Sequence, residues 1–154
     1  MDITINEYSA RDKSDVIQMM TSFYEIDGYD FDPEIGERNI SDFTSNEMLG
    51  RLYLIQYKKK NIGYIVLSFG FSFEYRGRDA FIDEFYIEEK FRNLGVGKQT
   101  MDFIESESKN LNINAIHLEV ESHNEKAKRL YLNSGYKSNN RTLLTKKINM
   151  TTNK

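Results

Sequence analysis

The spacing of apolar positions predicts that the chain begins with a short strand followed by two helices. Residues 3–8 show the two-residue period of a strand. Apolar residues recur at helical spacing through 16–24, which predicts an amphipathic helix. Pro33 suits the first turn of a second helix, with Asp32 as its cap and its end near residue 46.

Three strands are predicted next. Residues 52–57 and 62–73 flank a charged turn, and 80–87 is a run of β-branched and aromatic residues typical of a buried strand. In the second half of 62–73, Phe69, Phe71 and Phe73 alternate cleanly with small or polar residues, which indicates that one face packs against a core or against a second chain.

The C-terminal half predicts two more helices and further strands. The expected elements are a helix at 96–110, a strand at 114–121, a helix at 124–134, closing strands at 136–138 and 142–148, and a flexible tail at 148–154. This order predicts one α+β domain spanning 1–154, with α/β/α-like layers. A mixed, mostly antiparallel sheet of about six to seven strands would be flanked by four helices.

Composition narrows the class of protein. The 154 residues are 39% hydrophobic and 13% aromatic, as in a globular domain. Without cysteine, disulfides, cysteine-based zinc sites and thiol nucleophiles are excluded. A net charge of −3 argues against a general nucleic-acid binder. The first residues lack a signal peptide pattern, and no apolar run approaches the roughly 18 residues of a membrane span. We therefore expect a cytoplasmic protein with neither nucleic acid nor membrane as partner.

A glycine-punctuated turn, Arg92–Lys98, joins the buried strand at 80–87 to the helix at 96–110. Such a turn directs unpaired backbone N–H groups outward at the positive end of a helix dipole. Gly95 and Gly97 carry no Cβ, so an anion can approach the backbone closely. The turn therefore predicts a phosphate or pyrophosphate site.

The spacing excludes two familiar phosphate motifs. A P-loop needs a glycine five positions before the Gly97-Lys98 pair and Ser or Thr after it, but Arg92 and Gln99 stand there. A dinucleotide fingerprint needs a third glycine where the chain has Thr100. What remains is R-x-x-G-x-G-K after a strand.

A second group of residues lies on the predicted helix at 124–134. Asn124, Ala127 and Tyr131 share one helix face, and the small Ala127 leaves room there for an elongated ligand. Asn124 could then hydrogen-bond an amide, and Tyr131 could present a phenol.

These two motifs resemble those of the GNAT superfamily of N-acetyltransferases. R-x-x-G-x-G-K resembles its acetyl-CoA signature, Arg/Gln-x-x-Gly-x-Gly/Ala, and N-x-x-A-x-x-L-Y-x-x-x-G-Y from Asn124 to Tyr136 resembles its later motif. The resemblance covers residues 3–147 and the order of elements. The run F-I-D-E-F-Y-I at 81–87 is similar to members with an acidic pair in this strand, including the diamine acetyltransferases.

The resemblance implies acetyl-CoA as co-substrate, with no metal. It implies that backbone N–H groups of the turn hold the pyrophosphate, that Arg92 and Lys98 add charge, and that the strand edge pairs with the pantetheine arm. Asn124 would contact pantetheine beside Ala127, and Tyr131 would protonate the departing thiolate. The cofactor-binding residues implied are Phe85, Tyr86, Ile87, Arg92, Asn93, Leu94, Gly95, Val96, Gly97, Lys98, Asn124, Ala127 and Tyr131.

Asp83 and Glu84 are the candidates for the base. A primary amine with a pKa of about 10 is mostly protonated at neutral pH, so attack needs a proton acceptor. Adjacent strand residues point to opposite faces, so we expect only one of the two to reach the site. Glu84 is favoured, with Asp83 as the alternative; a salt bridge to Arg76 or Arg78, or a water chain in place of a base, stays open.

The acceptor pocket is expected next to the predicted N-terminal helices. Residues 25–37 carry six carboxylates and no Lys or Arg, which favours a cationic small-molecule amine, although a solvated loop would have the same composition. Tyr24 and Tyr29 are candidates to line the same pocket, as is Asp83. Acetylation of protein N-termini or lysines, and acyl-CoA sensing without turnover, are the alternatives. The aromatic-rich strands also make a homodimer plausible.

Overall fold

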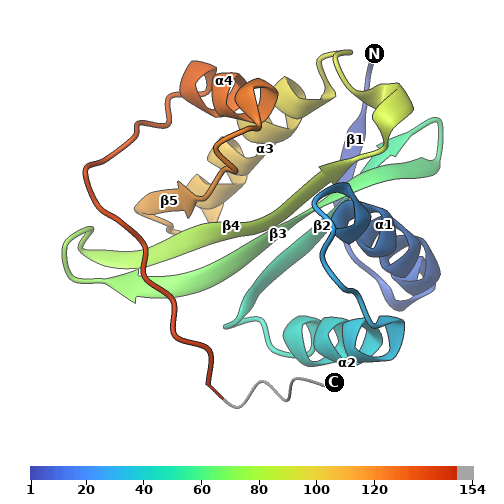
Figure 1. Cartoon of the computed structure of the whole chain (residues 1–154), viewed down its shortest axis with the longest axis horizontal. Coiled ribbons are helices and arrows are strands. Elements are labelled where there is room, and N and C mark those ends of the chain that lie inside the picture. The colour runs from blue at the N-terminus through green and yellow to red at the C-terminus, as the bar shows by residue number, and fades with distance from the viewer. Residues whose placement is uncertain (149–154) are drawn as a thin grey trace.

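A five-stranded sheet in the order β1-β2-β3-β4-β5 forms the centre of the molecule (Figure 1). The computed structural model describes residues 1–148, so the predicted tail falls outside the described residues except for Ile148. The elements are β1 (Thr4–Glu7), α1 (Lys13–Ile26), α2 (Pro33–Thr44), β2 (Gly50–Tyr57), β3 (Lys60–Ser72), β4 (Gly77–Ile87), α3 (Val96–Asn110), β5 (Ala115–Leu118) and α4 (Glu125–Asn133), with short 3-10 turns at Ala10–Asp12 and Glu89–Phe91.

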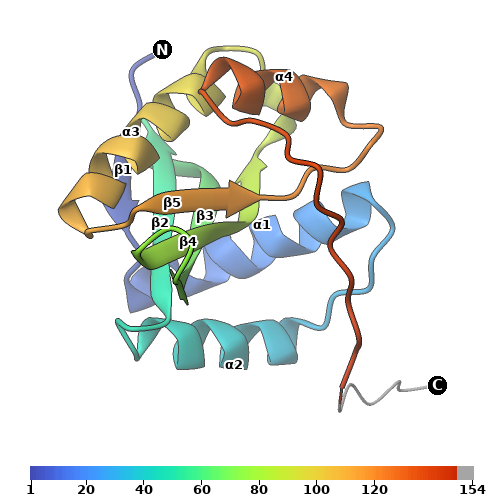
Figure 2. The same cartoon turned by 90° about the vertical axis from the view of Figure 1, so that its left-hand side faces the viewer.

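The helices cover both faces of the sheet, α1 and α2 on one and α3 and α4 on the other (Figures 1 and 2). One core cluster joins α1 and α2 to β2, β3 and β4, and includes Val16, Ile40 and Tyr64. A second joins β4 and β5 to α3 and α4, and includes Ile82 and Ile104. The predicted α/β/α layering and the four helices are confirmed.

The helices begin where local chemistry favours a start. The Asp32 side chain accepts hydrogen bonds from the backbone N–H groups of Glu34 (2.9 Å) and Ile35 (3.3 Å), and Pro33 occupies the first turn of α2.

None of the helices within residues 1–148 is both long and apolar enough to cross a membrane.

β4 and β5 separate part of the way along their length. They run parallel and pair only from Asp79↔Ala115 to Ile82↔Leu118, after which β4 continues to Ile87 without a partner on that side. The other edge of β4 stays paired with β3. The far half of β4 therefore offers free backbone donors and acceptors to a ligand.

A β-bulge lies where β4 and β5 separate. Val66 pairs with Glu84 and Leu67 with Ile82, so Asp83 is an extra residue in β4. The bulge reverses the alternation of side chains: Ile82 packs in the core beneath α3, whereas Tyr86 packs in the core beneath α1. Bulges of this kind commonly reorient side chains beside active sites.

The prediction of six to seven strands is wrong for the described residues, which form five. Residues 136–148 form neither expected closing strand, and β5 is shorter than the predicted 114–121. The closing segment carries its two central apolar residues, Leu143 and Leu144, at adjacent positions, so a strand there would present only one of them to each face. Arg141 instead forms a double hydrogen bond with Glu74 in the β3–β4 turn, at 2.7 and 2.8 Å.

Candidate active site

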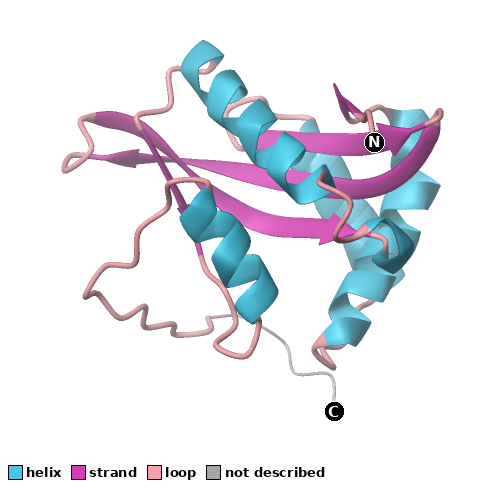
Figure 3. Cartoon of the chain, turned by 90° about the horizontal axis from the view of Figure 1, so that it is seen from above, coloured by secondary structure: helices cyan, strands magenta, loops and turns pink. Residues whose placement is uncertain are grey.

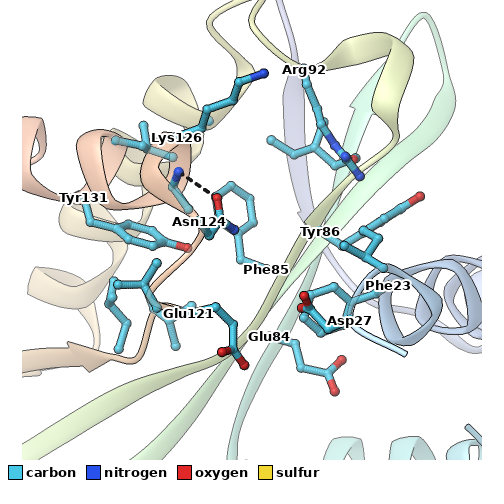
Figure 4. Close-up of a pocket in the computed structure, with 18 of the residues that line it drawn as sticks. Phe23, Asp27, Glu84, Phe85, Tyr86, Arg92, Glu121, Asn124, Lys126 and Tyr131 are labelled. Carbon is cyan, nitrogen blue, oxygen red and sulfur yellow. Dashed lines mark hydrogen bonds between the residues drawn. The ribbon is translucent and has the colours of Figure 1, made fainter. Parts of the chain in front are cut away.

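A cavity of about 910 Å³ opens between the free edge of β4, the end of α1 and the starts of α3 and α4 (Figure 4). Figure 3 shows the chain from above, with helices on both faces of the sheet. The cavity is the place where β4 and β5 separate, so its walls come from segments far apart in the chain. The predicted residues that line it are Tyr24, Tyr29, Asp83, Glu84, Phe85, Tyr86, Ile87, Arg92, Asn93, Gly95, Gly97, Lys98, Asn124, Ala127 and Tyr131.

The glycine turn supplies the end of the cavity next to α3. Asn93 and Gly95 adopt left-handed backbone angles, with φ of 61° and 81°, which Asn tolerates and Gly adopts freely. Gly95 is the N-cap of α3 and has no side chain to cap it, so the N–H groups of the first turn are free to bind an anion. This geometry suits a pyrophosphate group.

Only the backbone N–H groups of Leu94 and Val96 are candidates for binding a ligand. The Leu94 side chain is exposed and that of Val96 is buried in the core, and neither lines the cavity. Gly97 has a second role, because a Cβ there would lie 2.9 Å from Cδ2 of Leu130. The glycine thus lets α4 approach α3 closely, which sets the position of Tyr131 beside Leu130.

Arg92 and Lys98 lie at this end of the cavity, each already engaged. Arg92 Nε donates to the carbonyl oxygen of Ile87 at 2.7 Å, and its guanidinium lies over the Tyr86 ring, 5.6 Å from its centre. Lys98 pairs with Asp102 one turn along α3. Both cations are exposed enough to reach a ligand phosphate.

Tyr131 enters the cavity from α4 (Figure 4). Its side chain is 9% exposed and packs against the Tyr136 ring, with 6.0 Å between ring centres. Burial raises the pKa of Tyr131 to about 12, so the phenol keeps its proton at neutral pH. No group within residues 1–148 hydrogen-bonds the Tyr131 hydroxyl, which leaves it free for a ligand.

Asn124 and Ala127 lie at the start of α4. Oδ1 of Asn124 accepts a hydrogen bond from the Ala127 backbone N–H at 3.1 Å and so caps the helix (Figure 4). That bond occupies the amide oxygen and leaves the Asn124 amide NH₂ for a ligand carbonyl. The residue is therefore both a structural cap and a candidate ligand contact.

Glu84 is held on the α1 side of the cavity by two tyrosines. Tyr24 donates to Oε1 at 2.7 Å and Tyr64 to Oε2 at 2.8 Å. Burial, aided by the charge of Asp83, raises the pKa of Glu84, and the two tyrosine bonds offset part of that rise. A carboxylate can accept about four hydrogen bonds, so Glu84 keeps capacity for a proton from the substrate.

Asp83 also lines the cavity, so the expectation that only one member of the acidic pair reaches it is wrong. The bulge is the reason, because simple alternation does not hold across an extra residue. The cavity walls displace water from Asp83 and raise its pKa. Neither acid forms an ion pair with Arg76 or Arg78 in the described chain; Arg78 lies over the Phe69 ring instead, 4.9 Å from its centre.

The far end of the cavity is bridged by two loops. The Tyr29 hydroxyl, after α1, donates to Oε1 of Glu121, after β5, at 3.1 Å. His123 lies 3.2 Å from Asp27 across the same gap. These contacts narrow the opening between the ends of α1 and β5.

Fewer carboxylates of residues 25–37 line the cavity than the sequence led us to expect. Of its six carboxylates only Asp27 lines the cavity. Asp32 caps α2, and Glu37 pairs with Lys13 at 3.2 Å. The remaining three, Glu25, Asp30 and Glu34, lie exposed on the surface.

Other cavity residues were not anticipated in these roles. Glu119 and Glu121 follow β5 and face the cavity, and their alternation beside a predicted strand end was the available signal. Tyr64 was not anticipated because its contact with Glu84 depends on strand register. His117 lies 3.1 Å from Asp79, and no group of three or more His, Asp or Glu side chains within residues 1–148 is arranged to hold a metal ion.

Comparison with known proteins agrees with this geometry. The model of the acetyltransferase (GNAT) family matches residues 15–136. No curated protein sequence matches significantly. A solved integron cassette protein from the mobile metagenome of Cole Harbour Salt Marsh is 25% identical with a TM-score of 0.85, covering 94% of this chain and 90% of its own.

Two further solved structures carry acetyltransferase names. A GNAT family acetyltransferase of Staphylococcus aureus is 24% identical over 96% of this chain and 100% of its own, with a TM-score of 0.75. A predicted acetyltransferase of Clostridium acetobutylicum, solved with acetyl-CoA, is 16% identical over 94% and 96%, with a TM-score of 0.78. Since the family model spans most of the sequence and the neighbours share the whole fold, this chain belongs to the GNAT family of acetyltransferases.

Proposed function

We propose that the chain transfers the acetyl group of acetyl-CoA to a primary amine of a small cationic molecule. The observation that carries this proposal is the distribution of charge along one cavity. Three cations, Arg92, Lys98 and Lys126, lie toward the glycine turn and the start of α4 against one lining carboxylate there, Glu89. Asp27 and Glu121 lie at the bridged end. Such a cavity favours an anionic group at one end and a cationic one at the other.

The residues present suit acetyl-CoA. The uncapped start of α3 offers N–H groups for the pyrophosphate, and Arg92 and Lys98 add positive charge. The free edge of β4 from Phe85 to Ile87 offers backbone groups to the amides of the pantetheine arm, as a sheet edge does to an added strand. Asn124 supplies an amide group on the opposite wall.

Acetyl-CoA would supply the acetyl group as a thioester, which an amine can attack directly. Glu84 is the proposed acceptor of the amine proton, held in place by Tyr24 and Tyr64. Tyr131 is the proposed donor of a proton to the departing thiolate sulfur, since burial keeps its phenol protonated. The two groups enter from different walls, Glu84 from β4 and Tyr131 from α4, as the two ends of one reaction require (Figure 4).

The bridged end supports a small acceptor over a peptide. The Tyr29–Glu121 and His123–Asp27 contacts join the two loops that an extended peptide would have to separate. A small amine can enter beside them and place its further positive charges against Asp27, Glu119 or Glu121. Similarity of residues 81–87 to the diamine acetyltransferases favours the same class of acceptor.

The test is thiol release from acetyl-CoA with a panel of acceptors: diamines and polyamines, aminoglycosides, free amino acids and lysine peptides. We expect turnover with a multiply charged small amine, and loss of that turnover in Tyr131→Phe. Turnover with peptides alone would replace the small-amine proposal by protein acetylation. Tight binding of acetyl-CoA without turnover of any acceptor would favour a sensor, and no binding of any CoA ester would refute both.

A further inference from the structure

A second cavity lies between α1, the start of β3 and the end of β4. Its volume is about 290 Å³, close to the lower limit of about 300 Å³ for pockets that hold small molecules. The residues that line it are Asp15, Gln18, Met19, Ser22, Lys60, Asn61, Tyr86 and Glu88. Apart from Met19 and the Tyr86 ring, these side chains are polar or charged, so the cavity suits a polar ligand.

One face of α1 supplies half of this lining. Asp15, Gln18, Met19 and Ser22 stand at i, i+3, i+4 and i+7, which places them on the same side of the helix. The Gln18 amide and the Ser22 hydroxyl form no hydrogen bond with another side chain or with the backbone of residues 1–148. Each can both donate and accept, so α1 offers a ligand two uncommitted polar groups.

Asp15 is held in place by a buried amide. Asn61, which is 8% exposed, donates from Nδ2 to Oδ2 of Asp15 at 2.8 Å, and its Oδ1 accepts a bond from Gln56 at 2.8 Å. Lys13, two residues before Asp15, pairs with Glu37 instead, at 3.2 Å. The cavity therefore contains a carboxylate of fixed position that no cation of the described chain neutralises, as the ammonium group of a ligand requires.

The Tyr86 hydroxyl is an independent sign of a ligand. Tyr86 is 8% exposed, and its ring packs against Phe23 and Tyr64, with centres 6.2 and 6.0 Å apart. Its hydroxyl has no hydrogen-bond partner within residues 1–148, although a buried phenol normally has one. Figure 4 shows the hydroxyl end of the ring directed away from Tyr131, and Tyr86 lines both cavities. The hydroxyl is therefore free to donate to a ligand in the second cavity.

The side of the cavity formed by the sheet carries surplus positive charge. Lys60 lies 3.3 Å from Glu88, and Lys90 lies 3.2 Å from the same carboxylate. Two lysines thus share one glutamate, which leaves them able to attract an anionic group. The same pairing makes this side unsuitable for a divalent metal ion, because the lysines already neutralise Glu88.

We propose that the second cavity binds a free amino acid as its zwitterion, with the ammonium group at Asp15 and the carboxylate at Lys60 and the Tyr86 hydroxyl. Opposite charges on the two sides of the cavity match the two charged groups of such a molecule. Gln18 and Ser22 would hydrogen-bond a polar side chain of the amino acid.

This site is independent of the proposed acetyl transfer, because Asp15 and Lys60 lie outside the first cavity. Tyr86 is the one lining residue that both cavities share. A bound amino acid would therefore also contact a wall of the proposed acetyl-CoA site.

The first test is a titration of the ¹⁵N-labelled chain with L-alanine, L-serine and L-glutamine in turn, followed through the backbone amide signals. We expect saturable shifts at residues 15–22, 60–61 and 86–88. Ethylamine and propionate, which are L-alanine without its carboxylate and without its ammonium group, should each bind at least about tenfold more weakly than L-alanine. Shifts confined to residues 27, 83–84 and 119–121 would assign the amino acid to the first cavity, and no saturable shift with any of these amino acids at millimolar concentrations would also overturn the proposal.

The second test separates the two charges of the site. Asp15→Asn keeps an oxygen that can accept the bond from Asn61 and should weaken binding of L-alanine at least about tenfold. Lys60→Met should weaken L-alanine equally but leave the affinity for ethylamine unchanged, since ethylamine has no carboxylate. Glu25→Gln, an exposed acid of α1 that lines neither cavity, is the matched control and should bind L-alanine as the parent chain does. Unchanged affinity in both Asp15→Asn and Lys60→Met, or an equal loss in Glu25→Gln, would refute this assignment.

Discussion

Removing the Tyr131 hydroxyl tests the proposed chemistry at one atom. Tyr131→Phe keeps the ring, which is 9% exposed and packed against Tyr136. The hydroxyl has no hydrogen-bond partner in the described chain, so its loss orphans no buried group and the free energy of unfolding should hardly change. A large fall in the rate of this variant would therefore come from the missing hydroxyl in the reaction and not from a loss of folded protein.

The expected rate loss follows from the proposed role. Proton transfer by a positioned side chain contributes about 10²–10⁴-fold, which corresponds to roughly 3–5 kcal/mol of transition-state stabilisation. Because the pKa of Tyr131 is raised to about 12, the donor stays protonated at neutral and mildly alkaline pH. Wild-type kcat should therefore show no loss from this group below about pH 11.

The assay is kcat and KM for acetyl-CoA by thiol release, with Tyr136→Phe as the matched control. Tyr136 contacts Tyr131, and burial raises its pKa to about 12 as well, but it does not line the cavity. We expect kcat to fall at least a hundredfold in Tyr131→Phe with KM nearly unchanged, and to stay within threefold in Tyr136→Phe. Equal losses in both variants, or a loss below threefold in Tyr131→Phe, would refute its role as proton donor.

Four further predictions follow from single contacts. Glu84→Gln should remove the acid limb of the kcat/KM profile, which lies above the pKa of an ordinary glutamate because burial raises the pKa of Glu84. Glu107→Gln should leave that limb in place, because Glu107 accepts a 3.2 Å hydrogen bond from Tyr53 and neither residue lines the cavity. Gly95→Ala forces a side chain into φ 81°, at a cost of about 1–2 kcal/mol, and should raise KM for acetyl-CoA by roughly tenfold. Glu121→Gln should raise KM for a cationic amine, less so at high salt, and an unchanged KM would remove it from the acceptor site. Asp32→Ala should cost about 1 kcal/mol of stability in urea unfolding without changing KM, since this acid caps α2.

The elements and motifs that depend on short-range geometry were predictable. The turn at Arg92–Lys98 needs only two glycines and a helix start, and the Asn124–Tyr131 face needs only helical spacing. Backbone angles, helix periodicity and capping are set by residues within a turn or two of each other. The four helices, the first four strands and the fold family could therefore be inferred before any contact was known.

Contacts between distant segments depended on the tertiary structure. Tyr24 and Tyr64 reach Glu84 across 60 and 20 residues, and a one-residue bulge at Asp83 brings both acids into one cavity. No local pattern encodes a bulge, because it arises from how two strands pair.

Dependence on contacts between distant segments also explains why the acidic residues at the acceptor end, and the missing closing strands, were not predicted correctly. Which of six similar carboxylates faces the cavity depends on how α1, α2 and β5 pack, so only Asp27 of that stretch does. Residues 142–148 have the composition of a strand, but a strand also has to lie along an edge of a sheet, and the path of the chain after α4 takes this segment past the sheet toward α2 (Figures 1 and 2). Sequence sets local conformation and its hydrogen-bonding needs, whereas packing and register select the partners that meet those needs.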